Sequence, residues 1–134
     1  MELKILYGLI FTIILSGCDY YDERLQVENK SPNEVAVEIF LDSVPTLSEL
    51  NKTEYYIQNS IEPDESKRLM EMGSTRGWSF RIKKSNNDRL NLFVFQVDSL
   101  KIYGVDSLIS MGVYDKYILS EMYLNEENWI VVIE

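Results

Sequence analysis

The run from Leu90 to Val97 constrains the fold more than any other part of the sequence, because it is apolar at almost every position. Successive side chains of a strand point to opposite faces, so Leu92 and Val94 lie on the face opposite to that of Phe93 and Phe95. We therefore expect a strand that is buried on both faces, which requires a second layer of structure.

Residues that alternate between apolar and polar predict further strands along the chain. Leu25 and Val27 alternate with polar residues, residues 29–33 supply a turn, and Val35 to Ile39 alternate again, which is typical of a hairpin. Shorter β-prone runs predict strands at Tyr55–Ile57, Trp78–Ile82, Tyr114–Leu119 and Ile130–Ile133. Residues 63–72 fit a strand or a helix that begins at Pro63 and ends before Gly73; we favour the strand.

Only short helical segments are expected. Asp98 and Asp106, each followed by serine, can cap single helical turns, and residues 125–128 suggest one more turn. The predicted fold class is mainly β: a single antiparallel, immunoglobulin-like β-sandwich with one or two short helical turns, formed by residues 25–134.

The N-terminus has the layout of an exported protein. Lys4 precedes an apolar run from Ile5 to Leu15, which is too short to remain as a membrane-spanning helix. The segment Leu15-Ser16-Gly17-Cys18 resembles the bacterial lipobox. That resemblance implies a signal peptide over residues 1–17, cleavage before Cys18, and acylation of the Cys18 sulfur. Residues 18–24 then form the acylated cysteine and a solvated tether.

Acids follow the predicted anchor closely, at Asp19, Asp22 and Glu23. This segment resembles the surface-export signal of Bacteroidota lipoproteins, whereas an aspartate directly after the cysteine resembles an inner-membrane retention signal in other Gram-negative bacteria. The export reading predicts a lipid anchor in the outer membrane with the domain facing outward, and it is the one favoured here.

The mature region resembles a group of small Bacteroidota lipoproteins of unknown function. The residues that carry the resemblance are Asn29-Lys30-Ser31, Trp78, the run 88–95, Asp98-Ser99-Leu100 with Tyr103, and Ile118-Leu119 ahead of Leu124 and Trp129. The resemblance implies a single anchored domain and brings no activity or cofactor with it.

Composition argues against several functions. The chain has 22 acidic and 13 basic side chains, a net charge of −9, which disfavours nucleic acid as a partner. The same charge implies that the lipid bilayer is reached through N-terminal acyl chains and not through a basic face. The chain has no histidine and one cysteine, so no disulfide, metal site, cofactor or catalytic residue is expected, and the protein is not expected to be an enzyme.

Aromatic side chains are abundant and need not mark a site. We expect Trp78 and Trp129 in the core, and the pairs Tyr20-Tyr21 and Tyr55-Tyr56 in contact with solvent. Three Asp-Ser-aliphatic segments resemble the Bacteroidota acceptor for protein O-glycosylation, which makes Ser43, Ser99 and Ser107 candidate modification sites.

The function expected from the sequence is a binding or structural module at the cell envelope, for a protein or glycan ligand that the residues do not name. Two alternatives stay open. An immunity or inhibitor protein would use the acidic surface against a basic partner. A small carbohydrate-directed enzyme would use paired carboxylates, although the cluster of Glu121, Glu126 and Glu127 is more typical of a solvated face.

Overall fold

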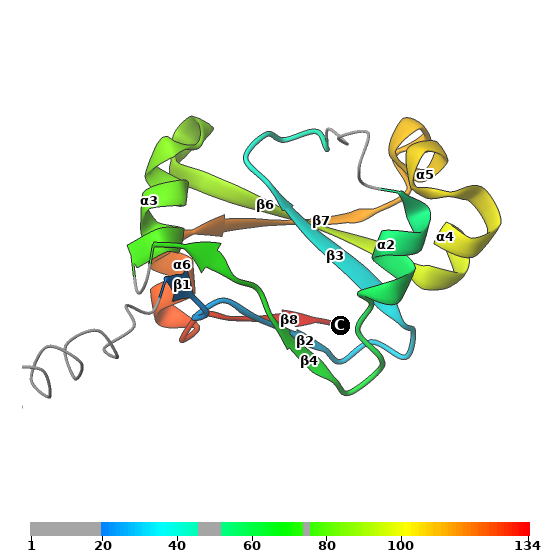
Figure 1. Ribbon diagram of the computed structural model, residues 1–134, viewed down its shortest axis with the longest axis horizontal. Coiled ribbons are helices and arrows are strands. Elements are labelled where there is room, and N and C mark those ends of the chain that lie inside the picture. Colours follow the sequence, from blue (N-terminus) through cyan, green and yellow to red (C-terminus); the bar gives the residue numbers. More distant parts are fainter. Residues whose placement is uncertain (1–19, 46–51, 74–75) are drawn as a thin grey trace, which may run out of the picture.

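The computed structural model describes residues 20–45, 52–73 and 76–134 (Figure 1). Within these residues the fold is mixed α/β, with five α-helices and with eight strands in two larger, three-stranded sheets and one two-stranded sheet. The predicted signal peptide, Cys18 and Asp19 lie outside the described residues.

The first large sheet is antiparallel and has the strand order β3-β6-β7. Its members are β3 (Val35–Phe40), β6 (Arg89–Gln96) and β7 (Asp115–Ser120). β6 is the central strand, and Leu92, Val94, Phe93 and Phe95 are all buried. The prediction of a strand covered on both faces is confirmed.

The second sheet has the order β4-β2-β8 and contains β2 (Gln26–Asn29), β4 (Ser66–Arg68) and β8 (Ile130–Ile133). β2 pairs with β4 in antiparallel and with β8 in parallel orientation. The expectation of purely antiparallel pairing is therefore wrong for β2 and β8. The strand prediction over residues 63–72 is confirmed by β4 and by β5 (Glu71–Met72).

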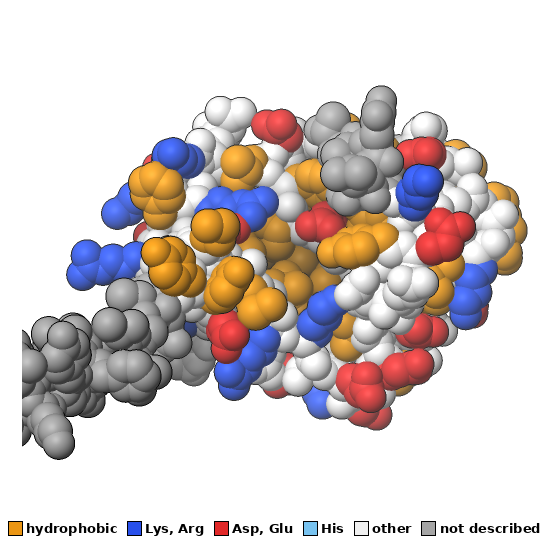
Figure 2. Space-filling model, in the orientation of Figure 1, with side chains coloured by type: hydrophobic (Ala, Val, Ile, Leu, Met, Phe, Trp, Pro, Cys, Tyr) orange, Lys and Arg blue, Asp and Glu red, His pale blue; other side chains and the backbone are white. Residues whose placement is uncertain are grey.

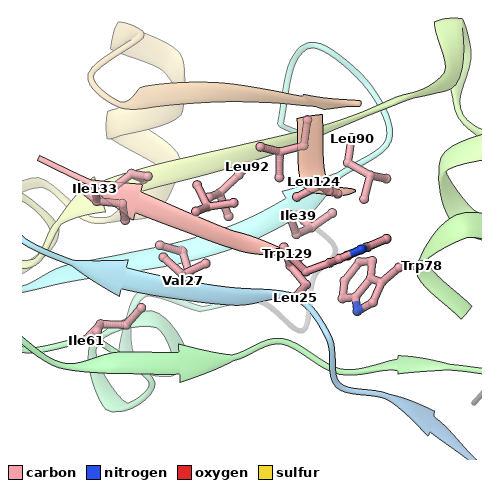
Figure 3. Packing of buried hydrophobic residues seen from close by; sticks show 14 of the residues in the cluster. Leu25, Val27, Ile39, Ile61, Trp78, Leu90, Leu92, Leu124, Trp129 and Ile133 are labelled. Carbon is pink, nitrogen blue, oxygen red and sulfur yellow. The ribbon is translucent and has the colours of Figure 1, made fainter. Parts of the chain in front are cut away.

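The two large sheets face each other across the main core (Figure 3). Val27 and Ile133 point from one sheet toward Leu92 and its neighbours in the other, and Leu25, just before β2, joins them. Trp78 and Trp129 close one end of this core and are 2% and 6% exposed, so the prediction that both tryptophans are buried is confirmed.

Helices cover the opposite face of the β3-β6-β7 sheet. Phe93 and Phe95 pack there with residues of α2 (Thr53–Gln58), α4 (Val97–Tyr103) and α5 (Val105–Met111). The sheet thus lies between a layer of helices and the second sheet. The helical content exceeds the one or two turns that we expected.

The other end of the molecule carries the remaining elements (Figure 1). There, β1 (Tyr21–Asp22) pairs with β5, next to α3 (Gly77–Lys84) and the 3-10 turn η2 (Asn86–Asp88). α6 (Glu121–Glu126) follows β7 directly, and its N-cap Ser120 accepts a hydrogen bond from the Tyr123 N–H.

The hairpin predicted from β2 and β3 does not form, because the two strands belong to different sheets. Asn29 is fully buried and turns the chain from one sheet to the other. Its amide donates to the carbonyls of Asn33 and Ile61, at 2.8 and 2.9 Å, and its oxygen accepts from the N–H and hydroxyl of Ser31.

Two predicted strands are helices. Trp78, Phe80 and Ile82 alternate in sequence, but only Trp78 and Ile82 are buried while Phe80 is 60% exposed. A separation of four residues places two side chains on one helix face, so the same residues also fit α3. Tyr55–Ile57 lies in α2, where Tyr55 is exposed and Tyr56 is buried. The prediction of an exposed Tyr56 is wrong because the ring packs against Phe95 beneath the helix.

Asp98 and Asp106 do lie at helix starts, yet neither is the cap. They occupy the first turns of α4 and α5, whose N-caps are Gln96 and Gly104, and neither cap makes a side-chain hydrogen bond. Gly104 has a φ of 78°, a backbone conformation that favours glycine, and it links the two helices without a longer loop.

Candidate ligand-binding cleft

A cleft of about 320 Å³ lies between β3 and β4, and residues of α2 and α3 complete its wall. Figure 2 looks onto this face and shows hydrophobic side chains lining a hollow near its centre. The volume is at the lower end of the range for small-molecule sites, and the cleft opens to solvent.

The floor of the cleft is apolar and well anchored. Trp78 and Tyr56 are almost completely buried beneath it, together with Val37 and Ile39 of β3. The Trp78 indole N–H donates a hydrogen bond of 3.3 Å to the Leu69 carbonyl, which fixes the ring against the chain that follows β4. The floor therefore offers apolar surface in a defined shape.

Four charged side chains line the cleft, Arg68 and Arg81 among them, and the two whose pKa is shifted are Glu38 from β3 and Lys67 from β4. Burial raises the pKa of the Glu38 carboxyl; a hydrogen bond from the Ile39 N–H and the positive charge of Arg81 oppose that change only in part. Burial likewise lowers the pKa of the Lys67 ammonium, and the charge of Glu38 offsets this effect in part. Both groups are thus partly desolvated, which disfavours their charged forms.

Neither group is neutralised by a direct ion pair in the described part of the chain. The Lys67 ammonium donates to the Asn59 carbonyl at 2.6 Å. Arg81, by contrast, forms an ion pair with Glu71, and its guanidinium lies 5.7 Å from the centre of the Trp78 ring. Partly desolvated charges in a cleft are a recognised mark of binding sites.

Beyond Val35, the outer edge of β3 borders the cleft and pairs with no other described strand. The Val97 N–H donates to the Glu34 carbonyl, so the even-numbered residues of this strand direct their backbone N–H and C=O groups toward β6. Val35 exchanges both of its backbone hydrogen bonds with Ile61 on the other side. Because the direction of bonding alternates along a strand, Val37 and Ile39 also direct their N–H and C=O groups away from β6.

The facing edge of β4 is arranged in the same way. Asn29 N–H donates to the Glu65 carbonyl and Leu69 N–H to the Leu25 carbonyl, so odd-numbered residues of this segment bond to β2. Ser66 and Arg68 therefore direct their backbone groups away from the sheet. The cleft is bordered by the outer edges of two strands from different sheets.

The residues singled out in the sequence lie elsewhere. Asp22 is buried and accepts hydrogen bonds from the Arg24 side chain at 2.8 and 2.9 Å and from the Trp78 N–H at 3.1 Å. Burial would raise the pKa of Asp22, but these hydrogen bonds together hold it below its usual value. Asp22 belongs to the folded domain, so its assignment to a solvated tether is wrong, whereas Glu23 is exposed as expected.

The candidate glycosylation sites differ in access. Ser43 lies in an exposed loop after β3 and Ser107 on the exposed side of α5, while Ser99 is half-buried in the first turn of α4. None of them lines the cleft, and neither do Glu121, Glu126 and Glu127, which belong to α6 and the residue that follows it.

Sequence reasoning missed the cleft because its walls come from distant segments. Glu38 and Lys67 fit the polar positions of ordinary alternating strands, and nothing local marks them as partly buried. The turn residues at 29–33 instead favoured a hairpin that would have paired β3 with β2.

Residues 20–45, 52–73 and 76–134 contain no group of three or more His, Cys, Asp or Glu side chains that could hold a metal ion. The same residues include no helix that is long and apolar enough to span a membrane. Comparisons with protein-family models, with curated proteins and with solved structures found no match.

Proposed function

We propose that this chain is a membrane-anchored binding module of the cell envelope, and that its cleft takes an extended segment of another polypeptide. The observation that carries the proposal is the outer edge of β3, where Val37 and Ile39 direct backbone groups into a cleft with an apolar floor. The anchor is Cys18, on the evidence of the lipobox resemblance.

An added strand suits this place for reasons of backbone chemistry. Unpaired strand edges are templates for pairing with another chain, and peptide-binding domains use them in this way. A segment alongside β3 would accept from the Val37 N–H and donate to the Val37 carbonyl. Its alternate side chains would enter the floor above Trp78 and Tyr56, which supplies selectivity for apolar residues.

Glu38 and Lys67 supply a second element of selectivity. Each charge lacks an ion-pair partner in the described residues, so a bound segment with a base near Glu38 and an acid near Lys67 would neutralise both. The same two charges disfavour an apolar strand of random sequence, which limits aggregation through this edge.

The structure bears differently on the two alternative functions considered from the sequence. An immunity or inhibitor protein remains a second candidate, since such a protein also binds a polypeptide and the chain is strongly acidic. A carbohydrate-directed enzyme gains less support, because the cleft is lined by one carboxylate, Glu38, while Glu71 nearby is bonded to Arg81.

We also propose that the two facing sheets form an immunoglobulin-like sandwich, with a helical layer added on one side. Their shared core, formed by residues such as Val27 and Leu92, supports this description. We further propose that the anchor lies in the outer membrane with the domain facing outward, and that the exposed Ser43 and Ser107 are O-glycosylated.

The test replaces Val37 with proline, which removes the outward N–H of β3 without removing a hydrogen bond to β6. Val132→Pro is the matched control. Val132 directs its backbone groups away from β2 at the outer edge of β8, and it does not line the cleft. A random peptide library displayed on phage is selected on the wild-type protein and on both variants, after thermal denaturation has shown that each is folded.

We expect the wild-type protein and Val132→Pro to enrich the same alternating sequences and Val37→Pro to enrich none. The enriched peptides should lose binding when alternate backbone nitrogens are methylated, a change that leaves the protein untouched. Equal enrichment on all three proteins, or full binding of the methylated peptides, would rule out strand addition at this edge.

A further inference from the structure

A second surface lies at the end of the molecule formed by β1, β5 and α3, and it combines exposed apolar side chains with bases that have no ion-pair partner among the described residues. We call it the α3 surface and define it by six residues: Tyr21, Met72, Arg76, Phe80, Lys83 and Lys84. Tyr21, Met72 and Phe80 are 56%, 67% and 60% exposed. Figure 2 shows hydrophobic and basic side chains gathered at this end, to one side of the hollow.

The backbone holds these residues close together. Tyr21 and Met72 are partners in the β1–β5 pair. Gly77 packs so closely on β5 that a Cβ there would lie 2.3 Å from the Met72 carbonyl oxygen, which brings the start of α3 against this pair. Phe80 lies further along the same helix, with the Lys84 ammonium 4.4 Å from the centre of its ring.

The charge of this surface is opposite to that of the whole chain. The acids of β1, β5 and the residue after β1 all have an arginine as ion-pair partner: Asp22 pairs with Arg24, Glu71 with Arg81, and Glu23 loosely with Arg68, at 3.9 Å. α3 itself contains no acid and has Arg81, Lys83 and Lys84 in its last turn. Arg76, Lys83 and Lys84 form no ion pair within the described residues.

Covalent geometry places this surface next to the proposed anchor. Cys18 precedes Tyr20 by two residues, and two residues span at most about 7 Å even when fully extended. An acylated Cys18 would therefore keep β1 at the level of the lipid headgroups.

We propose that the α3 surface lies on the lipid bilayer, with Tyr21, Met72 and Phe80 in the interfacial region and Arg76, Lys83 and Lys84 on anionic headgroups. Aromatic and methionine side chains beside bases have the chemistry of interfacial membrane contacts. This inference rests on the proposed lipid anchor. It also revises the expectation that the bilayer is reached through the acyl chains alone.

The experiment uses the mature protein purified from membranes, with its acylation verified by mass. Cys18 is consumed by the lipid, so one introduced cysteine can carry an environment-sensitive fluorophore. Met72→Cys reports on the α3 surface, and Met111→Cys, 53% exposed on α5, is the matched control at the opposite end. The protein is placed in vesicles of phosphatidylcholine with phosphatidylglycerol and quenched by lipids that carry nitroxides near the headgroup.

We expect several-fold stronger quenching at position 72 than at position 111. The double change Lys83→Glu and Lys84→Glu should weaken the quenching at position 72 in mixed vesicles and leave it unchanged in phosphatidylcholine alone. Equal, weak quenching at both positions in acylated protein would overturn the proposal. An emission change at position 72 that grows with protein concentration and does not depend on lipid composition would also overturn the proposal. It would show that a second copy of the protein, and not the bilayer, covers the α3 surface. An unmodified N-terminus would instead refute the anchor, which the mass reports separately.

Discussion

The two ends of the molecule both expose large apolar side chains, yet different forces hold them together. At the end formed by α4 and α5, Phe95, Leu100 and Leu108 form an apolar cluster, and a hydrogen bond of 3.0 Å from the Val105 N–H to the Thr53 hydroxyl links α5 to α2. At the α3 end, buried Asp22 and the Glu71–Arg81 pair tie β1, β5 and α3 together.

The comparison teaches that exposed apolar area does not by itself identify a membrane surface. Ile102 and Met111 at the α5 end are as exposed as Phe80 and Met72 at the α3 end. Acids, Asp98 and Asp106, lie in the first turns of α4 and α5, whereas α3 has no acid in its first turn and bases in its last. The two ends therefore differ in the charge around their apolar groups. They differ also in position along the chain, because the first described strand, β1, lies at the α3 end.

The largest expected effect concerns the apolar end. Phe95→Ala should lower the free energy of unfolding by about 3–5 kcal/mol, because it removes a fully buried ring that contacts Tyr56 and Tyr114 and leaves a cavity. Phe80→Ala is the matched control, since Phe80 is exposed, and should change it by less than about 0.5 kcal/mol. Denaturant unfolding measures both, and similar values for the two variants would break the comparison.

A smaller loss is expected at the polar end. Asp22→Asn should lower the free energy of unfolding by about 1–3 kcal/mol at neutral pH, because a buried carboxylate loses charged hydrogen bonds from Arg24. The pKa of Asp22 is lowered in the folded protein, so its contribution is complete above about pH 4, the usual pKa of an aspartate, and is lost as pH falls below that.

The measurement that checks this is unfolding of wild type and Asp22→Asn across acidic pH. The difference in free energy between them should shrink as the pH falls. A constant difference down to strong acid would show that the charge of Asp22 does not hold this end.

A gain in stability is expected in the cleft. The pKa of Glu38 is raised in the folded protein, so the protonated carboxyl favours the folded state. The free energy of unfolding therefore falls as the pH rises through that pKa. Glu38→Gln should therefore raise the free energy of unfolding at neutral pH by up to about 1 kcal/mol, an advantage absent at low pH. Loss of stability in this variant would mean that Glu38 serves the fold and not a ligand.

The smallest expected effect is that of Glu23, which differs in this respect from the neighbouring acid Asp22. Glu23→Ala should change the free energy of unfolding by less than about 0.5 kcal/mol, because Glu23 is exposed and lies 3.9 Å from Arg68. Protease treatment of intact cells should then report on export alone: reduced exposure of the variant supports the export signal, and unchanged exposure contradicts a role of Glu23. Asp22 is unsuitable for this purpose, since its replacement also disturbs the domain.

Much of the strand framework could be predicted from local pattern. β6 was identified because eight residues with few polar interruptions require cover on both faces, and β7 and β8 followed from short β-prone runs. The helices α2 and α3 were not identified, because three alternating residues such as Trp78, Phe80 and Ile82 fit both a strand and one face of a helix.

The candidate cleft could not be predicted, because it depends on contacts between distant parts of the chain. Whether β3 has one neighbour or two is decided by the turn at Asn29, which sends β2 into the other sheet. The pairing of Asp22 with Arg24 was equally hidden, since three acids near a predicted anchor resemble a solvated segment. Local composition predicted the strands, and the sheet pairing determined the site.

Whether Cys18 carries lipid decides how the whole molecule is oriented, and one mass measurement of the N-terminus answers it. Protein purified from membranes of its own host should begin at an acylated Cys18, and Cys18→Ala should remain unacylated with its first seventeen residues attached. A wild-type protein that retains Met1 would contradict the membrane anchor, and with it the assignment of the α3 end to the bilayer.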